Sequence, residues 1–598
     1  MSNIDLLNAE ILESVKANRL DQKLALKILH QLNSSRAEAE NRTADDIAII
    51  GIACRFPFAD TLEQYWDNLL NGVNGITDFP LKRRKDVDPL VRKIMGTPVY
   101  GKGSYLEEVD SFDAEYFRLS PKEAEFMDPH QRLMLEVAAE AIEDAGYMGE
   151  KIYGTQTGVF IGRDHHSSGL YQQFIDSSNE LAMTGNLPSF ISGRLAFFFN
   201  LTGPNQVIDT ACSSGLVALH QGCESLKHKE CKMAIVGGIS LNLLPLANSS
   251  FKIVENNDGK VRPFDKNAQG TTWGEGLSAI IIKPLRDALK DKDRIYSVVK
   301  GSGVNSDGAS NYITAPNPEA QERLLIDVWT KAGIHPETVS YIETHGTGTV
   351  VGDPIEVKAM KQAFDQYTNK KQFCGLGSVK SNIGHLVGAS GMASLIKVVL
   401  SMKHKQLVPT LHFEEPNPYI PFSQSPFYMV DKPLAWEQAQ GPRRAGISSF
   451  GFSGMNCHVL LEEWQQQEDH HTVREQPEEP RIFPVSAKTK SGLLELLHRY
   501  SQFLQANPQA DYQNLVYTAQ LGREHFSHRL AIIAKNSSEL RLHIASVLSD
   551  DVEQLSESIG YYRYFPIRQK AKNNMAQQDL SDATTKAAYD QAGRLGRQ

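Results

Sequence analysis

Three residues whose side chains could carry out nucleophilic chemistry stand at the ends of predicted strands. Cys212 lies in VIDTACSSG, where a β-branched strand turns into the helical pattern LVALHQGCESLK. A cysteine at a helix N-terminus lies beside free backbone N–H groups and the positive end of the helix dipole, which should lower the thiol pKa. The same N–H groups can hold a developing oxyanion. The alternative is a small buried core residue, because that is where most free cysteines are found.

Two histidines also follow predicted strands. His345 lies in ETHGTGT after the run SYIE, and His385 ends the run VKSNIGH before an apolar helix. Either histidine alone is more often a structural residue than a functional one. One thiol with two imidazoles, however, supplies what thioester chemistry needs, namely a nucleophile and donors for an oxyanion or enolate. This hypothesis requires Cys212, His345 and His385 to meet in one cavity.

The segments that must position these residues alternate between short apolar runs and helical patterns. From Ile47 to Trp464, strand-like runs such as IAIIGIA, TGVFIG and MAIVGGIS are separated by helical ones such as MLEVAAEAIEDAG and EAQERLLIDVWTKAG. This alternation predicts layered sheets with helices on their faces. Around this region we expect an amphipathic helix pair, linkers and a small second unit. We expect a helical segment at 1–35, the main α/β domain at 46–464, a linker at 465–480 and the small α/β unit at 481–560. Residues 561–598 form a tail that looks like the cut end of a longer chain.

The composition is that of a soluble globular protein. The 598 residues carry a formal charge of -9 and are 41% hydrophobic. A mild acidic excess argues against nucleic acid as a partner, because phosphate binding needs a basic surface. There is no signal-peptide pattern and no apolar run of about 20 residues that could span a bilayer, so we expect a cytoplasmic protein.

The cysteine and histidine spacing does not predict a metal site or disulfides. The six cysteines are scattered and none stands in C-x-x-C spacing. The adjacent pair His165 and His166 lacks a third ligand nearby. We therefore expect no bound metal.

The motifs together resemble those of the β-ketoacyl synthases, specifically the ketosynthase domains of modular type I polyketide synthases. The resemblance rests on DTACSS, ETHGTGT followed by GDPIE, VKSNIGHLVGASG and SSFGFSGMNCHVLLEE, and it covers roughly residues 46–464 in order. It implies a thiolase-like α/β fold of two similar halves in five α-β-α-β-α layers. It also implies a homodimer whose protomers share a continuous sheet.

The resemblance implies a reaction and its partners. Cys212 would accept an acyl chain from the phosphopantetheine arm of an upstream acyl carrier protein. A malonyl-type extender on a downstream carrier protein would then lose carbon dioxide, and its enolate would attack the Cys212 thioester. His345 and His385 would stabilise the enolate and assist decarboxylation, and the N–H groups of Cys212 and Phe452 would form the oxyanion hole. No tightly bound cofactor is implied.

Further residues take supporting and substrate-binding roles by the same resemblance. Lys380 and Glu356 would form a supporting ion pair, and Asn456 would brace the loop of Phe452, which is a gating residue of the substrate pocket. Thr347 and Thr349 are assigned supporting roles. The substrate pocket would also include Met183, Thr184 and Asn186. Met455 and Cys457 depart from the usual family residues, at positions without a catalytic role.

The regions that flank the ketosynthase also have family counterparts. Residues 481–560 resemble the adaptor that follows ketosynthases and normally leads into an acyltransferase, yet the chain holds no G-x-S-x-G acyltransferase motif. This resembles the trans-acyltransferase synthases, in which the acyltransferase is a separate protein. The segment 1–35 resembles a linker or docking segment.

Other functions remain to be weighed against condensation. A non-elongating transacylase usually lacks the histidine of ETHGTGT, and His345 is present. A thiolase would need a second reactive cysteine, and Cys457 lies in a ketosynthase context instead. A scaffold that only positions carrier proteins would not need the Cys-His-His set. The basic run 82–85 is either a solvated face or a contact for an acidic carrier protein.

Overall fold

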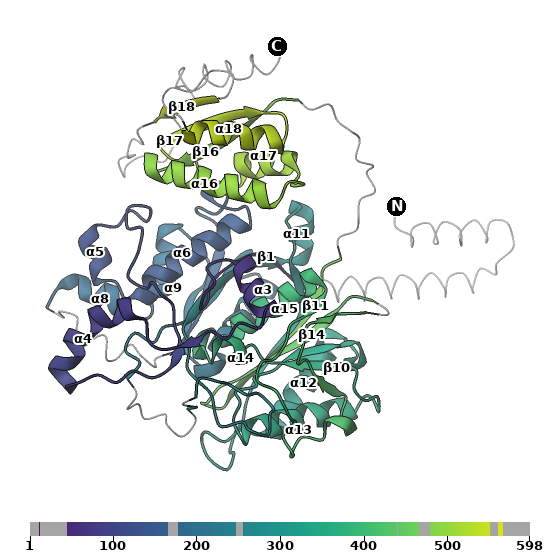
Figure 1. Ribbon diagram of the computed structural model, residues 1–598. Helices are drawn as coiled ribbons and strands as arrows, with labels where there is room; N and C mark the ends of the chain where they lie inside the picture. The colour runs from purple at the N-terminus through teal and green to yellow at the C-terminus, as the bar shows by residue number, and fades with distance from the viewer. Residues whose placement is uncertain are drawn as a thin grey trace. The chain divides into compact units, whose positions relative to one another are not determined.

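The computed structural model describes residue 11 and residues 45–164, 178–246, 255–256, 258–438, 441–465, 479–549 and 560–565 (Figure 1). The helix pair expected over residues 1–35, nearly all of the linker, His165, His166 and the tail beyond residue 565 lie outside the described residues. The chain divides into two compact units. One contains residues 1–145 and 154–465, and the other contains residues 146–153 and 466–598.

The first unit is built from two half-sheets that repeat the same strand directions. The first half-sheet runs in the order β1 (Ile47–Arg55), β7 (Gly276–Pro284), β6 (Met233–Ser240), β4 (Thr157–Arg163) and β5 (Asn205–Ile208). The second runs in the order β8 (Ser297–Ser306), β15 (Met455–Glu463), β14 (Arg444–Phe450), β9 (Tyr341–Glu343) and β10 (Cys374–Gly377), with β12 (Phe427–Met429) added at its edge. In each half the first three strands are antiparallel, and the remaining pairs are parallel. The two halves therefore share one topology.

Helices cover both half-sheets and fill the space between them. Helices α10 (Ser214–Lys227) and α15 (Ser390–His404) contact each other and pack on β4 and β14, respectively, in the middle layer. Helices α6 (Pro129–Asp144) and α9 (Phe190–Phe198) cover the first half-sheet, and α12 (Pro318–Ala332) and α13 (Gly352–Asp365) cover the second, on opposite sides of the unit (Figure 1). The predicted α-β-α-β-α order is confirmed. The two sheets are also joined, because β1 pairs with β8 over three residues as well as with β7.

The sequence patterns explain this arrangement. The inner strands are continuous apolar runs because sheets covered by helices on both faces are buried on both faces. Every residue from Ser390 to Met402 of α15 is buried, and apart from Lys397 these residues are apolar or small on every face, so the helix is not amphipathic. The middle layer is therefore a closely packed support for the residues at the N-termini of α10 and α15.

A buried ion pair ties β9 to this central helix. The Lys397 ammonium lies 2.7 Å from the Glu343 carboxylate, and both side chains are fully buried. Glu343 also accepts hydrogen bonds from the Tyr341 hydroxyl and the Val379 amide, each at 2.6 Å. These contacts fix the strand that precedes His345 against the helix that follows His385.

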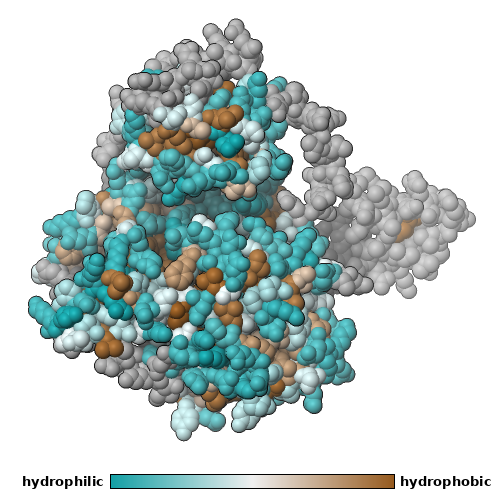
Figure 2. All heavy atoms as spheres, viewed as in Figure 1, coloured by the Kyte–Doolittle hydropathy of each residue, from teal (hydrophilic) through white to brown (hydrophobic). Residues whose placement is uncertain are grey.

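The remaining elements of the first unit lie around these layers. They are α3 (Leu62–Leu70), β2 (Ile76–Thr77), α4 (Leu81–Met95), β3 (Gly103–Ser104), α5 (Pro121–Phe126), α8 (Glu180–Asn186), α11 (Leu285–Asp291), α14 (Lys380–Ile383), β11 (Gln406–Leu407) and β13 (Leu434–Ala435). Figure 2 shows a largely hydrophilic face with apolar residues scattered over it, which is ordinary for a protein surface. Among the described helices, none combines the length and the apolar character needed to cross a membrane.

The second unit has its own sheet and core. Its elements are β16 (Arg481–Ala487), α16 (Lys490–Ala506), α17 (Tyr512–Leu521), β17 (His528–Ala534), α18 (Ser537–Ser549) and β18 (Gly560–Tyr564). The three strands form an antiparallel sheet in the order β16-β17-β18, and residues such as Phe483, Leu497, Ile532 and Ile544 form a buried cluster. The sequence reading ended this unit at residue 560 and missed β18. Its tyrosine-rich run has no apolar periodicity, and it is a strand because it pairs with β17.

Candidate active site

Cys212 lies in a tight turn between β5 and α10. The turn Ala211–Ser213 is a 3-10 turn that starts with Ala211 at φ 58°, and the first residue of α10 is Ser214. The Ser214 hydroxyl accepts the Thr210 amide at 2.9 Å, and the Ser449 hydroxyl from the other half of the fold donates to the Cys212 carbonyl at 2.7 Å. The main chain of the cysteine is therefore held from both halves. An equivalent 3-10 turn, Val387–Ala389 with Val387 at φ 39°, precedes α15.

Two backbone N–H groups are directed at the cysteine sulfur. They belong to Phe452 and to Cys212 itself, the pair expected for the oxyanion hole. The loop that carries Phe452 approaches closely because residue 451 is a glycine. A Cβ at Gly451 would lie 2.4 Å from the Thr210 carbonyl oxygen and 2.8 Å from the Ser213 hydroxyl oxygen.

Burial dominates the acidity of this thiol. Burial raises the pKa of Cys212 to about 11, although the Phe452 N–H and the Lys380 ammonium lower it. The expectation of a lowered thiol pKa was therefore wrong, because the loss of hydration outweighs the N–H groups at the turn. The resting cysteine is a neutral thiol at pH 7, and its proton must leave as the sulfur attacks.

The rate of alkylation of Cys212 should consequently keep rising with pH. Only the thiolate reacts with iodoacetamide, so the rate is expected to rise about tenfold per unit between pH 7 and 9. Mass spectrometry of Cys212 in the intact chain measures this, and Cys212→Ala is the control because it reports any alkylation of the other five cysteines, which are buried like Cys212. A rate that is already constant at pH 7 would contradict the raised pKa.

The ring of His345 accepts a hydrogen bond from the main chain of the second half of the fold. The Phe450 amide donates to His345 Nδ1 at 3.3 Å, so the neutral ring carries its proton on Nε2. Burial, followed by the nearby Lys380 ammonium and His385, lowers the pKa of His345 well below its usual value. The ring is therefore a neutral hydrogen-bond donor.

His385 lies beside His345 in a second buried position. Its Nδ1 lies 2.8 Å from the Ser390 hydroxyl at the start of α15, and its ring stacks on Trp273 with centroids 5.5 Å apart. The two imidazole centroids lie 5.6 Å apart with the ring planes at 86°. The second half of the fold thus presents two imidazoles next to each other.

Lys380 and Glu356 act on the same peptide of the His345 loop instead of pairing with each other. The Lys380 ammonium donates to the His345 carbonyl at 2.5 Å, while the Glu356 carboxylate accepts the amides of His345 at 2.7 Å and Gly346 at 2.9 Å. In the described part of the chain the two side chains form no ion pair, so the expected pair is wrong. The physical reason is that buried main-chain groups must also be satisfied, and these two charges satisfy them.

A second buried carboxylate lies close to Glu356. Burial raises the pKa of both Asp353 and Glu356 to about 7, and the charge of Asp353 adds to the rise at Glu356. Asp353 accepts the amides of Phe264 at 2.7 Å and Gly348 at 3.2 Å. The GDPIE segment is therefore the clamp that holds the loop after His345.

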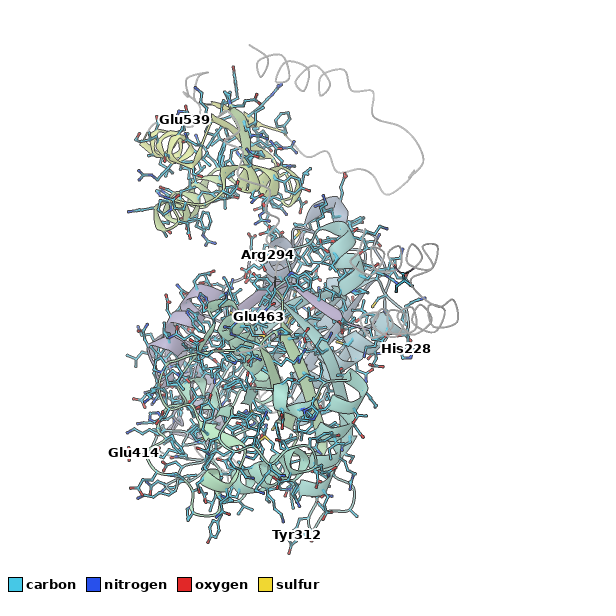
Figure 3. All side chains as sticks on the ribbon, turned by 90° about the vertical axis from the view of Figure 1, so that its right-hand side faces the viewer. His228, Arg294, Tyr312, Glu414, Glu463 and Glu539 are labelled. Atoms are coloured by element: carbon cyan, nitrogen blue, oxygen red, sulfur yellow. The ribbon has the colours of Figure 1, made fainter. Side chains whose placement is uncertain are left out.

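One cavity of about 770 Å³ joins these groups. Cys212, His345 and His385 all line it, and so do Phe452 and Glu356. Further lining residues include the apolar or neutral Ala211, Trp273, Thr314, Thr347, Thr349, Val350, Val387 and Phe450 and the acidic Asp164, Asp209, Asp307 and Asp353. The side chain of Tyr312, two residues before Thr314, projects from the surface of the first unit and is 78% exposed (Figure 3).

Other predicted residues are placed as follows. Phe452 is 49% exposed, and the hydroxyls of Thr347 and Thr349 lie 3.2 Å apart on the cavity wall. Asn456 is fully buried and donates to the Asp307 carboxylate at 2.7 Å, while the Asp307 amide donates to the Gly454 carbonyl at 2.8 Å. Asn456 thereby braces the loop through Asp307.

The three residues expected in the substrate pocket do not line this cavity. Met183, Thr184 and Asn186 belong to α8, which packs against α5, and Asn186 donates to the Ala182 carbonyl at 2.7 Å. Met183 is 65% exposed. Within one chain, α8 contacts α5 and α9 and does not line the cavity of Cys212, and the role of these three residues in binding substrate stays a prediction.

The basic run at residues 82–85 is divided between surface and core. Arg83 is buried and its guanidinium donates to Glu275 at 2.6 and 2.9 Å, whereas Lys82 pairs with Glu108 on the surface at 2.9 Å. In the described ranges, no three His, Cys, Asp or Glu residues gather as a metal site.

Sequence reasoning missed several residues that position the catalytic groups. Ser449, Ser390 and Trp273 contact the Cys212 turn or the His385 ring, as described above. Ser449 and Ser390 stand within quoted motifs, but a serine in a motif carries no signal of its own. Trp273 precedes GEG in a loop, and nothing in the sequence indicates that it reaches His385.

Comparison with known proteins agrees with this geometry. Three family profiles match in order: "Beta-ketoacyl synthase, N-terminal domain" over residues 44–288, "Beta-ketoacyl synthase, C-terminal domain" over 296–414 and "Ketoacyl-synthetase C-terminal extension" over 416–533. The chain is 41% identical to polyketide synthase PksL and 40% identical to PksM, both of Bacillus subtilis, over 84% and 83% of its length. It spans only 11% and 12% of these two relatives.

Solved structures cover nearly the whole chain. The ketosynthase from module 6 of the bacillaene synthase of Bacillus subtilis (C167S mutant) is 38% identical, with a TM-score of 0.77 and 87% of each chain covered. Ketosynthase twelve of the bacillaene polyketide synthase in Bacillus amyloliquefaciens is 35% identical, with a TM-score of 0.77 and coverage of 86% of this chain and 90% of that one. With the profiles in order and the whole neighbouring fold matched, the chain belongs to the β-ketoacyl synthase family, as a ketosynthase of the modular polyketide synthase type.

Proposed function

We propose that this chain is an elongating ketosynthase that joins an acyl chain to a malonyl-type extender by decarboxylative Claisen condensation. The observation that supports this most directly is that Cys212, His345 and His385 line one cavity together with the Phe452 N–H group. A thiol, an oxyanion hole and two imidazoles are the groups that both stages of the reaction require.

In the first stage, Cys212 takes the acyl chain from a carrier protein. The sulfur attacks the thioester carbonyl, the bond to the phosphopantetheine sulfur breaks, and the proton of the Cys212 thiol passes to that leaving sulfur. The N–H groups of Cys212 and Phe452 hold the oxyanion that forms in between. The neutral thiol agrees with this order, since the proton leaves during attack and not before it.

In the second stage, the extender loses carbon dioxide and its enolate carbon attacks the acyl–Cys212 carbonyl. The carbon–sulfur bond breaks, and the cysteine recovers its proton from solvent. The Nε2–H of neutral His345 is a donor for the enolate oxygen, and His385 lies beside it. Both rings are kept in place by the contacts to Phe450 and Ser390.

The partners follow from this role. Upstream and downstream acyl carrier proteins would present the substrates on their phosphopantetheine arms, and a separate acyltransferase would load the extender. A homodimer is supported by β5, which is the edge strand of the sheet and carries exposed Asn205 and Gln206. A second copy pairing along β5 would continue the sheet.

Intact-protein mass spectrometry tests the proposal. The wild-type chain is expected to gain an acyl group from an acyl thioester and to lose it on addition of malonyl-carrier protein, while Cys212→Ala gains none. Acylation without malonyl-dependent release would instead favour a non-elongating transacylase. Absence of any acylation would leave only a scaffold role and would overturn the proposal.

A further inference from the structure

Trp273 meets His385 through its main chain as well as through its ring. The two residues form a parallel bridge, in which the His385 amide donates to the Thr272 carbonyl at 2.7 Å and the Gly274 amide donates to the His385 carbonyl at 3.0 Å. The indole then stacks on the imidazole, with centroids 5.5 Å apart and ring planes at 27°. The indole is therefore placed by the same stretch of main chain that the histidine itself binds.

Glycines allow these two segments to lie so close together. A Cβ at Gly274 would lie 2.6 Å from the Ile383 carbonyl oxygen, and a Cβ at Gly384 would lie 2.7 Å from the Thr272 carbonyl oxygen. Gly384 also has φ at 68°, a conformation that side chains other than glycine rarely adopt. The main chain on both sides of the stack is thus built for close contact.

Glu255 anchors the far edge of the indole. The Trp273 Nε1–H donates to the Glu255 carboxylate at 2.6 Å. Glu255 is itself fixed, because it forms a parallel bridge with Thr271 and the following amide, of Asn256, donates to the Thr271 carbonyl at 2.6 Å. A hydrogen bond to a carboxylate is stronger than one between neutral groups, so the indole is held firmly in its plane.

The His385 ring needs such a support. The contact between its Nδ1 and the Ser390 hydroxyl fixes one ring atom, but a single hydrogen bond lets a ring tilt about that atom. A stacked aromatic face restricts the tilt. The plane matters because the His345 imidazole lies 5.6 Å away at 86°, and both rings must act on one enolate oxygen. Trp273 and His385 line the same cavity.

We propose that Trp273, anchored by Glu255, is a positioning residue that holds His385 in the plane required for decarboxylation and enolate stabilisation. This inference rests on the proposed function, in which His385 acts in the second stage. An aromatic stack of this geometry contributes about tenfold when its free energy is expressed as a ratio of rates. Its loss should slow the chemical step and leave the binding of the extender unchanged.

Single-turnover release of the acyl group from the full chain tests the proposal. Cys212 is first acylated with the N-acetylcysteamine thioester of butyrate, and malonyl-carrier protein is then added at increasing concentration. Intact mass gives the plateau rate and the half-saturating concentration. Trp273→Leu is expected to lower the plateau rate about tenfold or more, with the half-saturating concentration and the acylation rate of wild type. Trp273→Phe keeps an aromatic face and should recover most of the loss.

The anchor and a matched control are tested in the same way. Glu255→Gln retains an acceptor for the indole N–H and should stay close to wild type, whereas Glu255→Ala should fall towards Trp273→Leu. The control is Trp66→Leu, because Trp66 also stacks on a histidine, His404, with centroids 4.3 Å apart and ring planes at 10°. Neither residue of that second stack lines the cavity, so this variant should keep the wild-type plateau rate.

The outcomes separate this inference from the function on which it rests. A Trp273→Leu variant that melts like wild type and keeps its plateau rate would overturn the inference and leave the ketosynthase proposal intact. A rise in the half-saturating concentration alone, which is the result for a simple cavity wall, would do the same, and so would an equal loss of acylation and release. If Trp273→Leu failed to fold, Glu255→Ala measured against Glu255→Gln would decide. A wild-type chain that is acylated but shows no malonyl-dependent release would overturn both.

Discussion

Replacing His345 or His385 with alanine is expected to stop malonyl-dependent condensation while Cys212 is still acylated. The resting thiol is neutral and both rings belong to the second half of the fold, so their main role is to stabilise the enolate oxygen. Removing one preorganised donor costs about 10²–10³-fold in the rate of the step it serves. We therefore expect a loss of this size in malonyl-dependent release of the acyl group, with an acylation rate within about tenfold of wild type.

His220→Ala is a matched control for these variants. His220 is partly buried on α10 and its Nδ1 lies 2.9 Å from the Ser302 hydroxyl, but it does not line the cavity. It should retain both stages of the reaction. If the His345→Ala variant lost acylation as completely as condensation, the His345 imidazole would have to act as the base for Cys212. That result would contradict a role limited to stabilising the enolate.

Gly451→Ala is expected to lower the rate of Cys212 acylation by about 10²-fold or more without unfolding the chain. The added methyl group would meet the Thr210 carbonyl oxygen at 2.4 Å, and a backbone contact of this kind cannot be relieved by a side-chain rotation. The loop must move outward, and it carries the Phe452 N–H away from the cysteine. Acylation kinetics by intact mass measure the effect, and a thermal melt reports folding.

Gly193→Ala provides the corresponding control in a helix. Gly193 lies within α9, and a Cβ there would meet nothing within 4 Å. Alanine is a better helix former than glycine by about 1 kcal/mol, so this variant should be at least as stable as wild type and fully active. An acylation rate of Gly451→Ala equal to that of Gly193→Ala would show that the oxyanion hole does not depend on the approach of this loop.

The internal repeat explains how two distant segments build one site. Each half ends a parallel strand in a loop that leads, through a 3-10 turn with a positive φ at Ala211 or Val387, into a central helix. The two central helices pack on each other, so the starts of both helices come together. One half supplies the thiol there and the other supplies the imidazoles.

The local features of this protein could be predicted from its amino-acid sequence. Short β-branched runs followed by glycine-rich turns placed Cys212, His345 and His385 at strand ends, and the order of the motifs indicated the family and the layered fold. These features are local because strand ends, turns and helix starts depend on neighbouring residues.

Which of these residues contact one another, and in what charge state, depends on the folded arrangement of the whole chain. Lys380 and Glu356 hold one peptide from two sides, α8 carries Met183 away from the cavity lining, and residues 560–564 form a strand because β17 lies beside them. The thiol pKa rises because the folded chain removes water from Cys212. Burial and pairing depend on segments that are not neighbours in the sequence, and no local pattern contains that information.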